Sequence, residues 1–499
     1  MTHQTSNKTP SKHPPVMHSD YARWSPIWEA LRAAIEGQRA IKEAGNKFLP
    51  KMEGQNDAEY DAYLARATFY NMVGQTRSGL AGTIFKKKPK IYGLSPKLLK
   101  LTNSITKDGL SLTQLIKNVC DEILGVGRHG VLLDMDTAGK REPYFTRYDA
   151  EDIIDWDEQE IDGRLEVSEI ILQEHVYKRK KFGEQKKCLR EYRVLRLENN
   201  GTDANPRWEY EQHIYASTDD ADGDLTSEPT EVIVPTNREK RFNHIPFKFF
   251  GPYTNLSKVE RPALVDILDL NISHYQSYAQ LEHGRHYTAL PIYYATEAQN
   301  EKDSAGAATF VIGPNNVWMV GAGEKPGLLE YHGTGLRSLE VACATKEVQA
   351  NALGGRMAGV SSRNVSESDN QSKLREMHEQ SLLLNVVLTV DLGMTQLMRW
   401  WAEWQDVKNS DDIRVEVNTD FLFNELGARE LRAFHALYKD GIIPIDVLYA
   451  YLVKAELIPD EMDLEEFKSL LKKADQFPNQ ADVLARMRGF PDAKSEQAD

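Results

Sequence analysis

The chain has 499 residues, of which 41% are hydrophobic and 27% are charged, so it is long enough for two to four domains with a sizeable core. Its formal net charge is -14, whereas a protein that grips DNA through the phosphates is usually basic on at least one face. An acidic chain therefore indicates either that the protein binds no nucleic acid or that it has a surface that must not hold nucleic acid.

Other features bear on the compartment in which the protein works. No stretch approaches the roughly 18 consecutive apolar residues of a membrane span. Residues 1–20 lack the apolar segment of a secretory signal, and we interpret them as a disordered tail. Cys120, Cys188 and Cys343 are far apart and odd in number, which favours a reducing compartment without a disulfide framework. We expect no membrane partner.

Residues 20–85 are predicted to be helical. The stretch SPIWEALRAAIEG suggests Ser25 as an N-cap and Pro26 as the first helical residue. From Asp57 to Phe85, apolar residues recur at helical spacing, namely Tyr60, Tyr63, Leu64, Ala67, Tyr70 and Val73. We interpret this aromatic stripe as core rather than as a stacking surface for a ligand.

The stretch GVGRHG, residues 125–130, matches the G-x-G-x-x-G pattern of dinucleotide-binding loops. That fingerprint requires a strand before the glycines and a helix after them. Here SLTQLIKNVCDEIL precedes the glycines with helical spacing and Ser111 as an N-cap, and VLLDMD follows as a predicted strand. The reversed order favours a helix-to-strand turn, in which Gly125 and Gly127 end the helix and Gly130 opens the strand.

From about Val131 to Phe250 the pattern becomes that of strands, in runs such as VSEIILQEHVYK and RWEYEQHIYA, and we expect a mostly antiparallel sheet. From Arg261, RPALVDILDLNISHYQSYAQLEHGRH predicts one long helix with Pro262 at its start. Next, LPIYYATEA, ATFVIG and VWMVGAG predict strands, the last two joined as a hairpin by PNN.

The remaining chain is predicted to be mainly helical. A helix follows Gly335, and a Gly- and Ser-rich loop spans residues 354–371. A helix of about 50 Å then runs over residues 372–404, before a strand at DIRVEVN and a helical bundle over 426–474. The last residues are polar and are expected to be mobile.

Motifs of known catalytic chemistry are not recognisable in the sequence. It contains no P-loop, no H-E-x-x-H and no G-x-S-x-G. His283 and His286 lie three residues apart without a cluster of further ligands, which favours packed or surface histidines over a metal site. We interpret the basic runs at 86–90 and 178–181 as solvated charges. We therefore predict no catalytic residue, no cofactor and no metal, and an assembly role rather than an enzyme.

The order of the predicted elements resembles that of the portal proteins of tailed bacteriophages, of the long-tailed-phage type. The phrases YLARATFYNMVGQTRSGLAGTIFKKKP (Tyr63 to Pro89), LLDMD and PALVDILDLNISHYQSYAQLEHGRHYTALP (Pro262 to Pro291) look like this family. The resemblance covers residues 20–475. It implies a ring, usually of twelve copies, at one capsid vertex, through which double-stranded DNA is packaged and ejected.

The resemblance also implies partners and a location. The large terminase subunit docks during packaging, head–tail adaptor proteins replace it afterwards, and the major capsid protein surrounds the ring. The location is the virion, after assembly in the host cytoplasm. The fold class implied is α+β with a portal architecture. By element order, the chain divides into an N-terminal tail (1–20), a wing (21–260), a first stem helix (261–286) and a clip (287–334). A second stem helix (335–353), a tunnel loop (354–371), a long wing helix and strand (372–425), a helical crown (426–474) and a C-terminal tail (475–499) follow.

Two sets of residues are candidates for function within this map. Arg356 and Arg363 in the predicted loop, with Lys373 after it, are candidates for transient contact with DNA phosphates; exposed loop charges without a role are an equally good interpretation. The clip hairpin would dock partners by adding strands to a neighbour's sheet, with Phe310, Ile312, Trp318 and Val320 as candidates.

Two other classes of function remain open. One is an enzyme that acts on nucleic acid through a site of unfamiliar type, which bound metal or turnover of DNA would favour. The other is another structural ring of the virion, such as a scaffold or adaptor, although such proteins are usually much shorter.

Overall fold

The computed structural model of the chain describes residues 17–135, 142–178, 187–202, 206–216, 228–237, 240–288, 292–295, 326–329, 334–358, 369–407, 410–419, 428–454, 457–458 and 462–474. It divides into two compact units, residues 1–421 and 422–499. Both helices and sheets build the first unit, so the predicted α+β class is confirmed.

The first helix begins earlier than predicted. Helix α1 spans Ser19–Glu36, so Ser25 is not its cap and Pro26 lies inside it. An interior proline removes one backbone hydrogen bond. Tertiary contacts of the first turn offset that loss: the Tyr21 hydroxyl donates to the backbone carbonyl of Glu151, at 3.1 Å. The prediction that Pro26 is the first helical residue is therefore wrong, and the sequence pattern could not show this contact.

The predicted helical region is divided into several helices. Their bounds are α2 (Gln38–Glu43), α3 (Asp57–Arg66), α4 (Met72–Ile84), α5 (Pro96–Leu101) and α6 (Leu112–Val126), with a 3-10 turn η1 (Gly45–Lys47). Asn271 fixes the break between α3 and α4, because its Oδ1 accepts from the backbone N–H groups of Met72 and Val73. The predicted stripe is buried or partly buried except at Tyr70, which is exposed.

The glycine turn at 125–130 joins a helix to a strand, as predicted. Ser111 caps α6 in a reciprocal capping box. Gly127 ends α6 with a φ of 76°, in the left-handed region that favours glycine. Strand β2 (His129–Met135) follows immediately, so it opens one residue before Gly130.

Every pairing between the described strands of the sheets is antiparallel. One sheet has the order β11-β2-β3 and another the order β4-β5-β6-β7-β8. These strands are β3 (Pro143–Asp149), β4 (Ile153–Ile161), β5 (Arg164–Lys178), β6 (Lys187–Asn199), β7 (Trp208–Ala216), β8 (Glu231–Ile233) and β11 (Phe247–Phe250). The 3-10 turn η2 (Ala150–Asp152) links β3 to β4. The predicted mostly antiparallel sheet is confirmed.

Smaller pairings complete the set: β1 (Lys90–Tyr92) with β14 (Arg414–Glu416), β9 (Thr236–Asn237) with β10 (Lys240–Arg241), and β12 (Ile292–Ala295) with β13 (Pro326–Leu329). β12 lies in the predicted LPIYYATEA strand. Its partner β13 was not predicted. The predicted hairpin over 309–320 lies outside the described residues.

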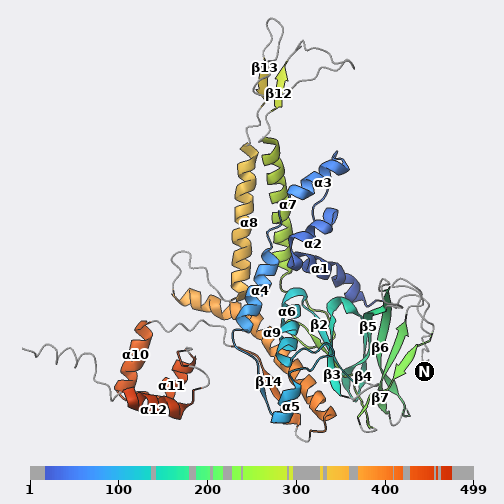
Figure 1. The fold of residues 1–499 in the computed structure, drawn as a ribbon, viewed down its shortest axis with the longest axis vertical. Coiled ribbons are helices and arrows are strands. Elements are labelled where there is room, and N and C mark those ends of the chain that lie inside the picture. Colours follow the sequence, from blue (N-terminus) through green and yellow to red (C-terminus); the bar gives the residue numbers. More distant parts are fainter. Residues whose placement is uncertain are drawn as a thin grey trace, which may run out of the picture. The chain divides into compact units, whose positions relative to one another are not determined.

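Three long helices follow the sheets (Figure 1): α7 (Val265–Thr288), α8 (Thr334–Ala358) and α9 (Asp369–Trp404). Helices α7 and α8 run side by side, and the β12–β13 pair lies on the connection between them. The loop predicted over 354–371 is wrong at both ends, because α8 continues to Ala358 and α9 already begins at Asp369. Arg356, Met357 and Ala358 have high helix propensities, and these outweigh the low helix propensities of the paired glycines at 354–355.

Helix α9 is the central helix of the core. It packs against α6, β11, β14 and both β2 and β3. Val386, Val390, Leu397 and Trp401 on its inner face are buried. By length and composition alone, Leu382–Trp404 could cross a membrane, which corrects the expectation that no stretch would approach such a span. Half of that helix is buried inside the structure, so its apolar composition is explained by the core.

The second unit contains α10 (Ala428–Lys439), α11 (Ile445–Lys454) and α12 (Leu464–Ala474), within the predicted helical bundle. The Tyr449 hydroxyl of α11 donates to the carbonyl of Met462, at 2.5 Å. The 3-10 turn η3 (Ser410–Asp412) precedes β14 in the first unit.

Candidate functional site

Polar side chains tie α7 to α8 along their length. Arg285 on α7 pairs with Glu340 on α8 at 2.7 Å, and His274 lies 3.2 Å from Glu347. In the other direction, the Lys346 ammonium donates to the carbonyl of Ser273 and to a neighbouring serine hydroxyl on α7. In these contacts the donating side chain lies on α7 in some cases and on α8 in others. Together they set the register of α7 against α8.

From residue 338 to residue 352, after the exposed Arg337, the outer face of α8 carries few charges. Between residues 338 and 352 its exposed residues are Ser338, Glu340, Val341, Ala344, Thr345, Val348, Gln349, Asn351 and Ala352. The one charged residue among them, Glu340, is paired with Arg285. Val341 and Val348, two turns apart, are 60% and 68% exposed. Small and apolar exposed residues on one helix face indicate a surface that packs against another molecule.

The predicted DNA-contact residues do not gather in one loop. Arg356 lies in the last turn of α8 rather than in the predicted loop, which corrects its placement, whereas Lys373 lies in α9, within the predicted long helix. Arg363 lies outside the described residues, as do the four clip candidates Phe310, Ile312, Trp318 and Val320. The end of α8 rests on α4: a Cβ at Gly354 would come within 2.9 Å of the Thr76 hydroxyl.

His283 takes part in packing. Its ring lies edge-on to Tyr63, with centroids 5.0 Å apart, and its Nδ1 is 3.3 Å from Arg66. Because a guanidinium can only donate, this contact occupies the lone pair of Nδ1 and leaves that nitrogen unavailable to a metal ion. The preference for a packed histidine over a chelating pair with His286 therefore agrees with the contacts of His283.

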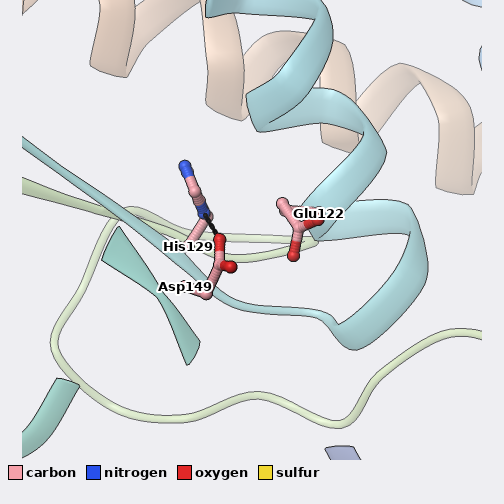
Figure 2. A group of neighbouring side chains, drawn as sticks. All are labelled: Glu122, His129 and Asp149. Carbon is pink, nitrogen blue, oxygen red and sulfur yellow. Dashed lines mark ion pairs between the residues drawn. The ribbon is translucent and has the colours of Figure 1, made fainter. Parts of the chain in front are cut away.

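A second site brings together Glu122, His129 and Asp149 (Figure 2), which come from α6, β2 and the end of β3. The candidate ligand atoms all lie within 4.8 Å of one another. His129 Nδ1 is 3.5 Å from Asp149 Oδ1, the contact drawn in Figure 2. We call these three residues the acid–histidine cluster.

Arg32 of α1 borders the acid–histidine cluster. Its Nη2 lies 2.7 Å from Glu122 and 3.8 Å from Asp149. The same guanidinium holds Glu151 of η2 through two hydrogen bonds, from Nε at 2.6 Å and from Nη2 at 2.9 Å. One cation is therefore shared among three carboxylates.

Burial determines the charge state of this site. Burial lowers the pKa of His129 to about 4, so the imidazole is neutral at neutral pH. Burial, with the neighbouring Asp149, raises the pKa of Asp152 to about 7. Glu122 behaves differently: burial opposes its ionisation, but the hydrogen bond from Arg32 together with the charges of Arg32 and Arg77 lowers its pKa. The site thus combines a neutral imidazole with carboxylates that outnumber their cation.

A cavity of about 330 Å³ adjoins the acid–histidine cluster. Asp149 and Asp152 line it together with Lys107, Asp108, Phe145, Thr146 and Arg147. Asp149 is 50% exposed at its side chain, whereas the side chain of His129 is 1% exposed. The cavity therefore connects solvent to the carboxylate side of the cluster.

Sequence reasoning missed the acid–histidine cluster. His129 is the fifth residue of GVGRHG, and Glu122 lies in the last two turns of α6, so both flank the glycine turn. The left-handed Gly127 reverses the chain and carries His129 back toward Glu122. Asp149 reaches them only because β3 pairs with β2, with His129 opposite Asp149. The spacing of residues along the chain does not encode this pairing of β3 with β2.

Part of the chain matches a known family model. A family model described as a domain of unknown function (DUF4055) matches residues 263–405, which contain α7, α8 and α9. No curated protein matches the chain.

Two solved structures that resemble this chain belong to gene transfer agent particles. A chain in the neck of an empty gene transfer agent particle is similar at 10% identity and a TM-score of 0.36, covering 84% of this chain and 95% of that chain. A chain in the virion of a native gene transfer agent particle is similar at 10% identity and a TM-score of 0.36, covering 88% and 99%. We draw no functional conclusion from similarities at this level.

Proposed function

We propose that the chain is the portal protein of a tailed bacteriophage. Copies form a ring at one capsid vertex, and double-stranded DNA passes through its channel during packaging and ejection. The large terminase subunit docks on the ring first, and head–tail adaptor proteins dock afterwards. The protein is a virion component without catalytic activity of its own.

One observation supports this proposal most directly. Two long helices, α7 and α8, lie side by side, a strand pair interrupts the chain between them, and a very long helix follows. This order is the one that the family resemblance implies for stem helix, clip, stem helix and returning wing helix. In the proposed assignment, the stem helices are residues 265–288 and 334–358 rather than 261–286 and 335–353, and the tunnel loop shortens to residues 359–368.

The surface of α8 agrees with a ring. Stem helices of adjacent copies would meet through the uncharged face that exposes Val341 and Val348. A heterologous interface of this kind closes into a ring when its rotation closes. The net charge of -14 suits a channel that must let DNA slide, because sustained phosphate contacts would retard it. Arg356, Arg363 and Lys373 stay candidates for brief contacts that centre the duplex.

The first experiment is to measure the mass of the purified chain by light scattering and to image it by negative stain. The expected result is a ring of about twelve copies with a central hole. Val341→Glu together with Val348→Glu should prevent assembly, because each interface would bury two unpaired charges. Val232→Glu, also at an exposed valine, is the matched control and should assemble normally.

The competing functions predict other outcomes. An enzyme acting on nucleic acid would stay monomeric at 56.7 kDa and would hydrolyse or modify DNA in a turnover assay. That combination would overturn the portal proposal. A ring that forms but fails to bind the large terminase subunit would favour another structural ring of the virion.

A further inference from the structure

We propose that the acid–histidine cluster, Glu122, His129 and Asp149, binds a divalent transition-metal ion, with Zn²⁺ as the best chemical fit. The ion would be structural: it would fasten α6 to the β2–β3 hairpin at the point where the glycine turn joins them. This inference does not depend on the proposed portal function.

The distances are close to those of a metal site. Zn²⁺ binds nitrogen and carboxylate oxygen at about 2.0–2.2 Å, so two ligands in a tetrahedral site stand about 3.3–3.6 Å apart. The 3.5 Å between His129 Nδ1 and Asp149 Oδ1 already has this value. The third ligand atom, on Glu122, lies within 4.8 Å of both. The proposed site therefore requires the Glu122 side chain to rotate so that its carboxylate closes the remaining gap.

The state of His129 points independently to a ligand. The ring is fully buried, and neither Nδ1 nor Nε2 has a hydrogen-bond partner among the described residues. A buried polar group without a hydrogen-bond partner destabilises the folded state. Nδ1 faces the Asp149 carboxylate without bonding to it, which is the arrangement of two ligands on either side of an ion. Metal binding would satisfy this nitrogen in its neutral form.

The local charge also favours a cation. Glu122, Asp149 and Glu151 share the guanidinium of Arg32 as an ion-pair partner, and Arg77 and Arg147 add positive charge at longer range. Arg32 can release Glu122 to a metal and still keep both of its hydrogen bonds to Glu151. The ion would therefore replace the contact of Arg32 with Glu122 and leave the pairing of Arg32 with Glu151 intact.

The ligand set selects the type of metal. Mg²⁺ and Ca²⁺ prefer oxygen ligands throughout, whereas an imidazole with two carboxylates suits Zn²⁺. The 330 Å³ cavity beside Asp149 provides a route for the ion and room for a water as fourth ligand. A metal site needs ligands at the right distances, negative charge for the ion to neutralise, and a route by which the ion can enter.

The test uses the full chain, stripped with a chelator and titrated with Co²⁺, whose visible absorption bands report a tetrahedral site of nitrogen and oxygen ligands. We expect one Co²⁺ per protomer, displaced by Zn²⁺ but not by equal Mg²⁺, and a rise in melting temperature with Zn²⁺. Loss of a supporting residue near a metal costs 10–100-fold in affinity, so loss of a ligand should cost at least about 100-fold. His129→Gln and Asp149→Asn should each show that loss.

The control is His213→Gln. His213 lies 3.4 Å from Glu211, so it is a histidine beside one carboxylate on the same chain, without the third ligand. This variant should bind Co²⁺ like the wild type. Asp149 is half exposed, so Asp149→Asn should fold even if His129→Gln does not, and far-UV circular dichroism checks both. Failure of the wild type to take up Co²⁺ or Zn²⁺ would overturn the proposal, as would unchanged binding in folded Asp149→Asn.

Discussion

Arg193 on β6 is expected to be one of the most costly polar residues to remove. Its side chain is 10% exposed and bonds across two sheets: Nη1 donates to Asp134 of β2 at 2.8 Å and to Gln212 of β7 at 2.9 Å. Nε donates to Glu174 of β5 at 2.9 Å. The guanidinium therefore holds the three-stranded sheet against the five-stranded sheet.

Arg193→Met should lower the free energy of unfolding by about 3–5 kcal/mol, the cost of removing one partner of a buried ion pair. Most of this cost falls on Asp134, whose side chain is 6% exposed and would stay buried with its cation gone. Glu174 is 23% exposed, so water can replace part of its lost bond. The double variant Arg193→Met with Asp134→Asn should recover part of the loss, because it removes the stranded charge.

The assay is urea denaturation followed by far-UV circular dichroism, with Arg196→Met as the matched control. Arg196 lies on the same strand and pairs with Glu169, but both side chains are about a third exposed. Pairs of that kind contribute about 0–1 kcal/mol. The reasoning would be refuted if the two arginine variants lost equal stability, or if the double variant were no more stable than Arg193→Met.

Three further predictions concern local features of the fold. Gly127→Ala should destabilise the chain by about 1–2 kcal/mol from its left-handed backbone alone, and further because the new Cβ would lie 2.8 Å from Pro262 Cα; a melting temperature equal to that of the wild type would contradict this. Ser111→Ala should cost about 1 kcal/mol by removing the cap of α6, measured by denaturation, with restoration expected in Ser111→Thr. Burial raises the pKa of Asp391 to about 7 from its ordinary 3.8, so the wild type should lose stability as pH rises between those values, when the unfolded chain has released the proton and the folded chain has not. Asp391→Asn keeps an acceptor for the N–H of Val417 and should melt higher than the wild type by a larger margin at pH 8 than at pH 5; an equal difference at both values would exclude this cause.

The sequence pattern was sufficient for elements whose signal is local. The helix at 112–126 was predicted with its cap, because Ser111 and the apolar spacing act within a few residues. The long helix α7 and the strands after residue 129 were also predicted, since periodicity reflects which face is buried. The glycine turn was assigned correctly because the left-handed φ of Gly127 is a property of that residue itself.

Elements that depend on distant contacts were predicted less well. The early start of α1 rests on contacts with residues far along the chain, such as Glu151. The break before α4 rests on Asn271, about 200 residues away in sequence, and β13 exists only as the partner of β12. Helices α8 and α9 extend into the predicted loop because glycine and serine weaken a helix without forbidding it.

The sequence by itself determined the order of helices and strands, the acidic charge and the absence of a familiar catalytic motif, because composition and periodicity are written along the chain. Only the tertiary structure decided which charges meet. His129 and Asp149 face one another through the register of β2 and β3, and Arg32 joins them from α1. His129 and Arg32, which are 20 and 117 residues from Asp149 in sequence, meet it at one site only when the sheet pairs and the core closes, and no local pattern specifies that event.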